Sequence, residues 1–253
     1  MIASAVTAGE CQVWWADPRQ ETIETLVGDL SANELRRAAR FRREPDRRRF
    51  LTGAWLLREA AGDRLGVRPA DVVVDRTCPD CDRYHGKPRV VTEEESLHVS
   101  ISHSGDRVAV ALTDVGPLGV DVEAVPETPV DDLARCALTE SERQALAALP
   151  EHARYEGFAR IWVRKEAALK ATGHGLRISP DRVEVTGPGE SPALLGWPVD
   201  VPPEAVRIHP LDPGPGYVAV VAVVGGDHGI TIREADAALL RGRAGIATAR
   251  QAA

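Results

Sequence analysis

The order of helical and strand-like segments is the feature of this sequence that most constrains its fold, because one succession occurs twice. Helical patterns begin near Ala32 and extend over residues 46–65, and strand patterns follow them. A second helical pattern over residues 153–171 is again followed by strands. Helices followed by a run of strands are typical of the α+β class. We therefore predict two α+β lobes, over residues 1–117 and 118–253.

Local signals mark where several of these elements begin and end. A hydroxyl residue followed three positions later by glutamate forms a capping box at Ser31–Glu34 and again at Thr139–Glu142, so a helix is expected to begin just after each. Gly173 is typical of a helix C-terminus. Strand-like patterns cover residues 11–16, 71–75, 97–101, 107–113, 118–122, 182–186, 205–209 and 217–224, and residues 78–88 are rich in turn signals.

Length and composition favour a cytoplasmic enzyme. The chain has 253 residues, enough to bury a sizeable core, and 43% of them are hydrophobic. No apolar run approaches the roughly 18 residues that a membrane span needs, and the first ten residues lack the basic start of a signal peptide. Four cysteines in this length do not suggest a disulfide scaffold. We therefore expect no membrane partner.

Charge is distributed unevenly along the chain. The formal net charge of −7 argues against a nucleic-acid partner, which requires a basic surface. Yet one short segment holds eight arginines against only two acidic residues, Glu44 and Asp46. The segment is either a solvated helix face or a basic patch that binds a phosphorylated ligand or an acidic partner. Its arginines are Arg36, Arg37, Arg40, Arg42, Arg43, Arg47, Arg48 and Arg49.

Asp121-Val122-Glu123 is the first candidate for chemistry. Residues two apart on a strand point to the same face, so the two carboxylates are expected side by side. Neighbouring carboxylates repel each other unless a cation or a proton lies between them. Hard oxygen ligands suit Mg²⁺, which keeps several waters and leaves room for substrate phosphates. The alternative is an exposed strand end that is merely acidic.

A second candidate lies on the helical pattern that ends at Gly173. Trp162, Glu166 and Lys170 stand at positions i, i+4 and i+8, close to one face of a helix. Glu166 is placed to complete a metal site or to act as a base, and Lys170 is placed to neutralise a phosphate. The alternative is a Glu–Lys surface pair.

Two turn motifs complete the polar candidates. The pattern of residues 99–105 predicts a strand that ends in the turn Ser102-His103-Ser104, which a glycine closes. Hydroxyls, an imidazole and a backbone N–H at a strand end are suited to hold a phosphate. Gly86-Lys87-Pro88 places a cation beside a rigid proline. Either motif alone is also compatible with a purely structural turn.

Cys78 and Cys81, followed by His85, have a spacing that occurs in zinc sites. A structural zinc site normally has four protein ligands, and only His85 is near enough in sequence to be a third. Cys11 and Cys136 stand far away along the chain. We therefore expect a turn with two reduced thiols and no zinc.

Together, the order and spacing of these motifs resemble the full motif series of Sfp-type phosphopantetheinyl transferases. The resemblance covers about residues 12–240, and its Cys-x-x-Cys-x-x-x-His-Gly-Lys-Pro form is similar to bacterial members that serve secondary metabolism. One departure is Ser100, where the family often has asparagine. The matching segments are Arg40-Phe41, Arg49-x-x-x-Gly53, Gly86–Pro88, Ser102–Gly105, Gly119–Glu123, Trp162–Gly173 and Asp212–Gly214.

The resemblance implies two similar α+β lobes related by a pseudo-twofold axis, with coenzyme A in the cleft between them. It also implies roles for individual residues. Asp121, Glu123 and Glu166 match the Mg²⁺ carboxylates of the family, and Asp121, Glu166 and Lys170 are the catalytic candidates. The residues expected to bind coenzyme A are Arg37, Arg49, Lys87, Ser102, His103, Lys165 and Lys170.

The activity implied by the resemblance is transfer of the phosphopantetheine arm of coenzyme A to a serine of a carrier protein, with release of adenosine 3′,5′-bisphosphate. The acceptor would be an acyl or peptidyl carrier domain of a polyketide, nonribosomal peptide or fatty-acid synthase, and the enzyme is expected to be a monomer. A Mg²⁺-dependent phosphohydrolase and a non-catalytic coenzyme A-binding module remain the alternatives.

Overall fold

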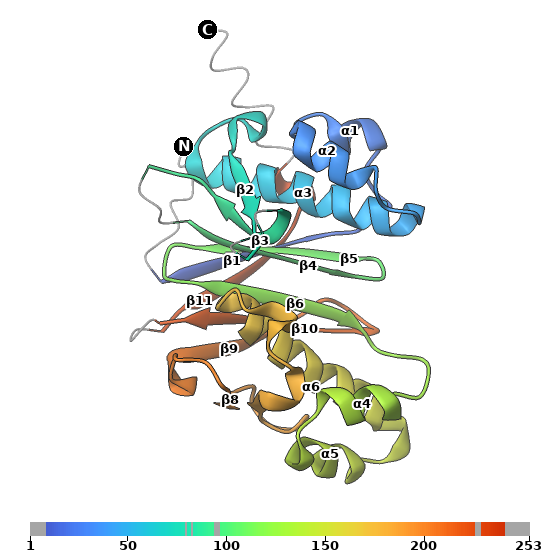
Figure 1. Ribbon diagram of the computed structural model, residues 1–253. Helices are drawn as coiled ribbons and strands as arrows, with labels where there is room; N and C mark the ends of the chain where they lie inside the picture. Colours follow the sequence, from blue (N-terminus) through green and yellow to red (C-terminus); the bar gives the residue numbers. More distant parts are fainter. Residues whose placement is uncertain (1–8, 79, 82, 94–96, 226–228, 241–253) are drawn as a thin grey trace, which may run out of the picture. The chain divides into compact units, whose positions relative to one another are not determined.

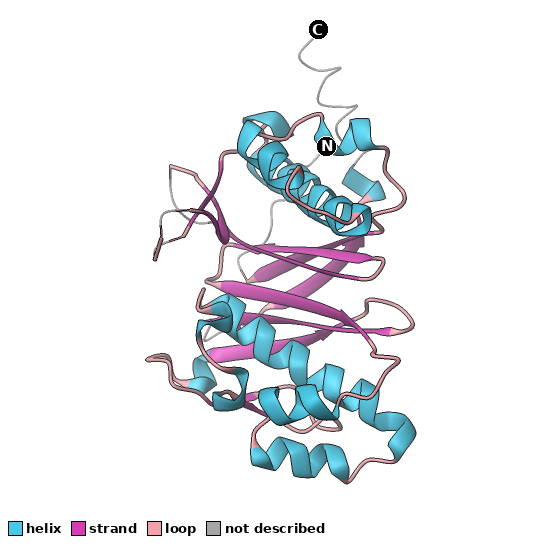
Figure 2. Ribbon diagram, turned by 45° about the vertical axis from the view of Figure 1, so that its right-hand side comes forward, coloured by secondary structure: helices cyan, strands magenta, loops and turns pink. Residues whose placement is uncertain are grey.

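The computed structural model of the chain describes residues 9–78, 80–81, 83–93, 97–225 and 229–240. They group into two compact units (Figures 1 and 2). The first unit contains the described residues up to Asp114 and those from Ile230 onward, and the second is Val115–Gly229. The sequence analysis predicted that residues 118–253 form one lobe, whereas in the structure the described residues from Ile230 onward belong to the first unit.

A four-stranded sheet forms the centre of the first unit, in the order β11-β1-β5-β4. Strand β1 (Glu10–Ala16) is antiparallel to β5 (Arg107–Thr113) and parallel to β11 (Thr231–Asp236). Strand β4 (His98–Ser104) is antiparallel to the other side of β5. The side chain of Trp15 donates to Glu234 at 2.8 Å, across 219 positions of the sequence.

Helix α3 (Glu44–Leu65) packs on this sheet and carries much of the core (Figure 1). The shorter helices α1 (Ile23–Val27) and α2 (Ala32–Ala38) pack against it. Leu51 and Leu57 of α3 are fully buried, and each such side chain contributes about 1.5–3 kcal/mol to folding. None of the helices in the described residues has the length and apolar character required to span a membrane.

A separate hairpin of β2 (Val74–Thr77) and β3 (Tyr84–Val90) follows the 3₁₀ turn η1 (Pro69–Asp71). The predicted strand over residues 71–75 therefore begins later, and the predicted turn over 78–88 contains a strand. The pairing is irregular between Asp75 and Thr77. The sequence of β3 lacks the regular apolar alternation by which a strand is recognised, so this strand was not predicted.

The second unit has a three-stranded antiparallel sheet in the order β6-β10-β9, and helix α6 (Glu151–Ala171) packs on it. Its strands are β6 (Leu118–Ala124), β9 (Val206–Leu211) and β10 (Tyr217–Val224). The middle strand β10 has six consecutive buried residues. Each unit combines helices with antiparallel strand pairs, so the predicted α+β class is confirmed.

Smaller elements complete the second unit. They are α4 (Asp131–Ala137), α5 (Glu140–Ala147), β7 (Glu184–Val185), β8 (Leu194–Gly196), and the 3₁₀ turns η2 (Gly175–Arg177), η3 (Pro180–Arg182) and η4 (Pro203–Ala205). The predicted strand over residues 182–186 is thus reduced to two residues after a 3₁₀ turn. Both predicted capping boxes are confirmed, at the starts of α2 and α5.

A buried ion pair ties the capping box of the first unit to its long helix. Glu34 is fully buried and accepts hydrogen bonds from Arg58 of α3 at 2.8 and 3.0 Å. Arg58 also donates to the carbonyl oxygens of Pro69 and Val72, at 3.1 and 2.8 Å. We call these residues the Glu34–Arg58 network.

The second unit repeats this arrangement. Glu142 of the second capping box is buried, and the Nζ of Lys165 of α6 lies 2.5 Å from its carboxylate. Lys165 also donates to the carbonyl oxygens of Ala137 and Pro180, at 2.8 and 2.9 Å. We call these residues the Glu142–Lys165 network.

Candidate active site

Three carboxylates lie together in the second unit, two from β6 and one from α6. Asp121 and Glu123 stand two apart on β6, and Asp121 is 2% exposed. Glu166 of α6 is 9% exposed, and the negative charges of Asp121 and Glu123 both act on it. The predicted acidic constellation therefore forms within one unit.

Gly119 explains how closely β6 approaches α6. A Cβ atom at this position would lie 2.1 Å from the carbonyl oxygen of Ala167 and 2.5 Å from the backbone nitrogen of Ala171. Helix backbone cannot yield as a flexible side chain can, so only glycine permits this contact. The close approach sets Asp121, two residues further along β6, against the helix that carries Glu166.

The environment of Glu166 disfavours a negative charge. Burial and the negative charges of Asp121 and Glu123, opposed by the positive charge of Lys170, together raise the pKa of its carboxyl to about 7. Its buried Oε1 has no hydrogen-bond partner within the described part of the chain. A buried carboxylate oxygen beside two more carboxylates fits a hard divalent cation, which would relieve both the desolvation and the repulsion.

Lys170 is in direct contact with this cluster. Its Nζ donates to Asp121 Oδ1 at 2.6 Å and to the carbonyl oxygen of Val120 at 3.4 Å. The side chain is 28% exposed, so it is accessible from solvent. Glu166 and Lys170 were predicted to lie close to one face of the helix, and in the structure both interact with Asp121 of β6.

The prediction that Lys165 binds coenzyme A does not agree with its position in the structure. The sequence analysis placed it among the residues expected to bind coenzyme A. In the structure it is 0% exposed and held in the Glu142–Lys165 network. Consecutive helical residues lie about 100° apart around the axis, so neighbours in sequence face different surroundings. Lys165 therefore belongs to the core of the second unit and not to a ligand surface.

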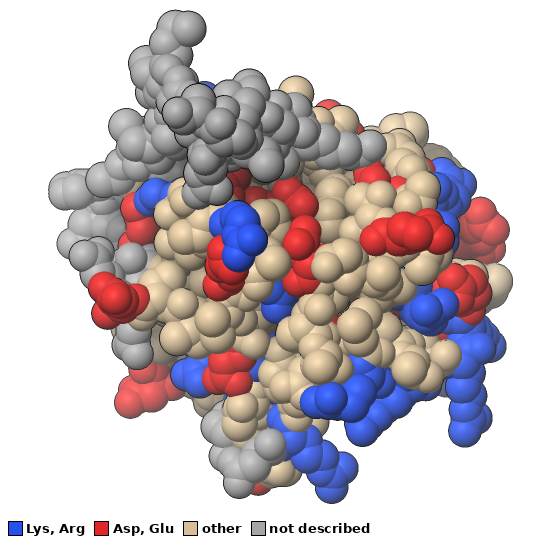
Figure 3. Space-filling view, turned by 90° about the horizontal axis from the view of Figure 1, so that it is seen from above, with Lys and Arg blue, Asp and Glu red and all other residues tan. Residues whose placement is uncertain are grey.

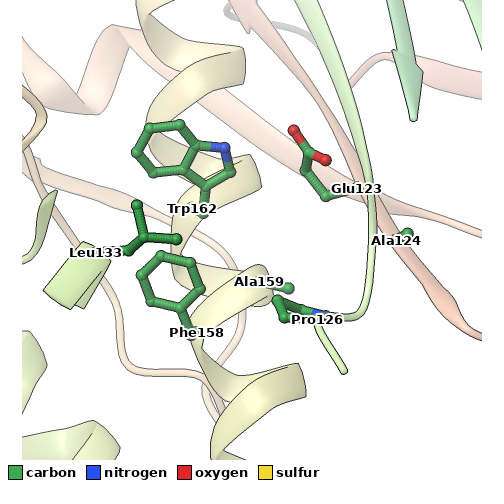
Figure 4. A pocket seen from close by; sticks show the side chains of 7 residues that line it. All are labelled: Glu123, Ala124, Pro126, Leu133, Phe158, Ala159 and Trp162. Atoms are coloured by element: carbon green, nitrogen blue, oxygen red, sulfur yellow. The ribbon is translucent and has the colours of Figure 1, made fainter. Parts of the chain in front are cut away.

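An apolar pocket of about 260 Å³ adjoins the carboxylates (Figure 4). The rings of Phe158 and Trp162 and the side chain of Leu133 lie on one side, and Glu123 lies across from them. The two rings stack with centroids 6.3 Å apart. Ala124, Pro126 and Ala159 complete the lining.

In the first unit, the Ser-His-Ser motif forms the end of the β4–β5 hairpin. Ser104 pairs with Arg107, and Gly105, with φ of 52°, adopts the left-handed conformation that a two-residue turn requires. His103 is exposed, whereas Ser102 is buried. Arg49 of α3 donates to the carbonyl oxygen of Gly105 at 3.2 Å, so the structure brings this arginine to the motif.

Lys87 lies on β3, one residue after Gly86. A Cβ atom on Gly86 would lie 2.8 Å from the carbonyl oxygen of Thr77, so glycine is required where the irregular pairing brings the strands together. Burial lowers the pKa of Lys87 to about 8. Burial also lowers the pKa of His98 on β4, and the charge of Lys87 lowers it further. Lys87 therefore lies near the strand that carries the Ser-His-Ser motif.

Arg76 is a candidate that sequence reasoning missed. It is 8% exposed, and burial, followed by the charge of Arg37, lowers its pKa to about 10. Arg37 stacks over the ring of Phe50 at 5.1 Å. Among the described residues, Arg37 Nη1 and Arg76 Nε are buried without a hydrogen-bond acceptor. Two adjacent guanidinium groups of this kind fit an anion. The signal available was that Arg76 shares the inward face of its strand with Val74.

The arginine-rich segment serves two purposes. In the space-filling view, Lys and Arg side chains gather toward one edge of the visible face (Figure 3). Arg40, Arg42 and Arg43 are exposed. Arg48 instead donates to the carbonyl oxygens of Pro18 and Glu21, at 2.7 and 3.0 Å, and so fixes the chain before α1. The exposed arginines agree with the solvated face, Arg48 has a structural part, and the ligand patch stays a prediction.

Two family models match the chain, one in each half. Residues 117–222 match the 4′-phosphopantetheinyl transferase superfamily model, and residues 13–114 match a model described as 4′-phosphopantetheinyl transferase, N-terminal. The first match includes Asp121, Glu123, Glu166 and Lys170.

Individual proteins are similar over most of their length. The 4′-phosphopantetheinyl transferase HetI of a Nostoc strain is 32% identical over 83% of this chain and 84% of its own. The 4′-phosphopantetheinyl transferase psf-1 of Bacillus pumilus is 31% identical over 77% of this chain and 79% of its own. The 4′-phosphopantetheinyl transferase Sfp of Bacillus subtilis is 24% identical over 77% of this chain and 83% of its own.

Proposed function

The chain belongs to the 4′-phosphopantetheinyl transferase superfamily, and from this membership we propose that it transfers phosphopantetheine from coenzyme A to a carrier-protein serine. The observation that carries the proposal is the cluster of Asp121, Glu123 and Glu166 with Lys170. Phosphoryl transfer depends mainly on positioning and on neutralising charge, and this cluster offers both.

Asp121, Glu123 and Glu166 would hold Mg²⁺. The buried oxygen of Glu166 and the mutual repulsion of the carboxylates support this ligand set. When bound, the ion would neutralise the pyrophosphate of coenzyme A and the charge that develops on it during transfer.

Glu166 is the proposed acceptor of the serine proton. The serine oxygen forms a bond to the pantetheine-side phosphorus, and the bond from that phosphorus to the bridging oxygen breaks. Adenosine 3′,5′-bisphosphate leaves with the bond electrons, and the serine proton passes to the Glu166 carboxylate directly or through water. Lys170, at 2.6 Å from Asp121, is near enough to the cluster to stabilise the transferring phosphate.

Residues of the first unit are assigned to the nucleotide end of coenzyme A. Arg49 and His103 stand at the β4–β5 turn and would donate charge-assisted hydrogen bonds to phosphate. Lys87 and Arg37 would do the same. The buried and unsatisfied N–H groups of Arg37 and Arg76 support an anion in their vicinity.

The apolar pocket beside Glu123 is assigned to the pantetheine arm. Its volume of about 260 Å³ and its lining by Phe158, Trp162 and Leu133 suit the geminal methyl groups of that arm. The acceptor would be an acyl or peptidyl carrier domain, whose serine must then approach the carboxylate cluster.

The direct test is the intact mass of an apo carrier protein incubated with this protein, coenzyme A and Mg²⁺. We expect a gain of one phosphopantetheine, and its loss when a chelator is added. Asp121→Ala should lose nearly all transfer, and Lys170→Ala should lower the rate by orders of magnitude while the protein stays folded. Glu127→Ala, an exposed acid in the loop after β6, is the matched control and should remain active.

Other outcomes would contradict the proposal. Steady metal-dependent hydrolysis of coenzyme A without transfer to any of several carriers would indicate a phosphohydrolase. Binding of coenzyme A that survives loss of Glu166 and Lys170, with no transfer, would indicate a binding module. Full activity of Asp121→Ala would remove this residue from the metal site.

A further inference from the structure

Three potential metal ligands converge where the chain turns from β2 to β3. The Sγ atoms of Cys78 and Cys81 and a ring nitrogen of His85 all lie within 4.8 Å of one another. Cys81 Sγ is 3.0 Å from His85 Nε2. The sequence offered His85 as a third ligand but no fourth, so we expected no zinc; the structure brings all three side chains together and leads us to revise that expectation.

We propose that Cys78, Cys81 and His85 form a zinc site, separate from the carboxylate cluster. Zinc binds thiolate sulfur at about 2.3 Å and imidazole nitrogen at about 2.0–2.1 Å in tetrahedral geometry, so its ligand atoms lie about 3.6–3.8 Å apart. The 3.0 Å between Cys81 Sγ and His85 Nε2 lies below these values, and the 4.8 Å that bounds all three separations lies above them.

The ligand set selects zinc over the ions that carboxylates prefer. Two soft thiolates and an imidazole suit Zn²⁺, whereas Mg²⁺ takes hard oxygen ligands. The fourth position is open to a water or to the carboxylate of Asp80, whose Oδ2 lies 3.9 Å from Cys78 Sγ. A zinc ion bound by two cysteines and a histidine stays tetrahedral when an aspartate or a water is its fourth ligand.

The position of the site gives it a structural purpose. The β2–β3 hairpin has only two strands, and such a hairpin has little stability of its own in water. A metal bridging Cys78, before the turn, and His85, on β3, would cross-link its two arms. Gly86 and Lys87 follow His85 directly, so the same cross-link would fix the start of the segment that carries Lys87.

The test is the zinc content of the full-length protein, purified under reducing conditions without chelator and dialysed against metal-free buffer. We expect one zinc per chain in the wild type and in Cys136→Ser, which removes an exposed cysteine elsewhere and serves as the matched control. Cys81→Ser and His85→Asn should lose the metal. Both positions are exposed, so these variants should keep the circular dichroism spectrum of the wild type.

Titration of the metal-free protein with Co²⁺ provides a second readout, independent of zinc acquired during expression. A thiolate-to-cobalt charge-transfer band should saturate at one equivalent in the wild type and in Cys136→Ser, and be absent in Cys81→Ser. Three results would overturn the proposal: zinc-free wild type that shows no cobalt band, zinc retained by Cys81→Ser, or a Cys78–Cys81 disulfide as the form purified under reducing conditions.

Discussion

The two units contain the same buried network, built from different residues. In each, the glutamate of a capping box is buried and pairs with a cation from the long helix, and the cation also donates to two backbone carbonyl oxygens. The first unit uses Glu34 and Arg58, and the second uses Glu142 and Lys165. A shared scaffold is thus visible in the contacts even though the sequence shows no repeat.

The two units differ in the charge of the side chains at their candidate sites. The first unit presents basic side chains on its hairpins, such as Arg76 on β2 and Lys87 on β3. The second presents carboxylates, directly on the strand and the long helix that form its core. The comparison teaches that one buried arrangement is compatible with basic side chains in one unit and with a carboxylate cluster in the other.

Removing the buried carboxylate from each network should produce the largest loss of stability. Glu34→Gln and Glu142→Gln would each leave a buried cation without its partner, at a cost of about 3–5 kcal/mol in the free energy of unfolding. Urea denaturation followed by circular dichroism measures both. Glu140→Gln, at an exposed position beside Glu142, is the control and should change little. A large loss in one unit only would show that the two networks are not equivalent.

The second largest effect is expected from replacing the glycine at the helix–sheet contact of each unit with alanine. Gly119→Ala meets the backbone of α6 and must push β6 away, costing about 1–3 kcal/mol and separating Asp121 from Glu166. Gly53→Ala meets a movable side-chain atom of Ile101 at 3.1 Å and should cost less. Thermal melts and metal-dependent transfer should both fall further for Gly119→Ala. Equal effects would contradict the idea that β6 and α6 need the closer approach.

Arg76→Met should act on affinity and stability in opposite directions. It removes a buried guanidinium group beside Arg37, so the protein without ligand should melt at a higher temperature. Affinity for coenzyme A should fall about tenfold, the loss of one hydrogen bond to a charged group. Calorimetric titration measures the affinity, and Arg83→Met, at an exposed position of the same hairpin, is the control. Unchanged affinity would exclude Arg76 from the anion site.

The smallest effect concerns pH and is specific to the second unit. With its pKa raised from 4.5 to about 7, Glu166 keeps a proton in the folded protein that the unfolded chain has released. In the presence of chelator, stability should therefore decline as the pH rises through this window. Melting temperatures at several pH values should show this slope in the wild type and a weaker one in Glu166→Gln. Mg²⁺ should raise the melting temperature at neutral pH in the wild type alone.

Local features of the fold could be predicted from sequence, because they depend on neighbours along the chain. Both capping boxes, the strand Arg107–Thr113 and the strand Tyr217–Val224 are found where they were expected. Strand β11 was not predicted. Its exposed and charged residues lack a strand-like pattern, and it is a strand because β1, far away in sequence, pairs with it.

The candidate site shows the same limit. Spacing put Asp121, Glu123, Glu166 and Lys170 on suitable faces, and the fold of the second unit brings them together. Spacing did not reveal that Lys165, next to Glu166, points into the core. Arg76 was missed because the signal that it carries, a place on the inward face of β2 with Val74, is weak in a strand of four residues.

The pairing of β11 with β1 has a consequence for how the chain is made. Residues 115–229 are contiguous, so the second unit has all its strands as soon as they leave the ribosome. The first unit, although synthesis starts with it, lacks an edge strand of its sheet until the segment after residue 230 emerges. Domains generally fold as units during synthesis. The half of the protein that is translated first is therefore the half that is completed last.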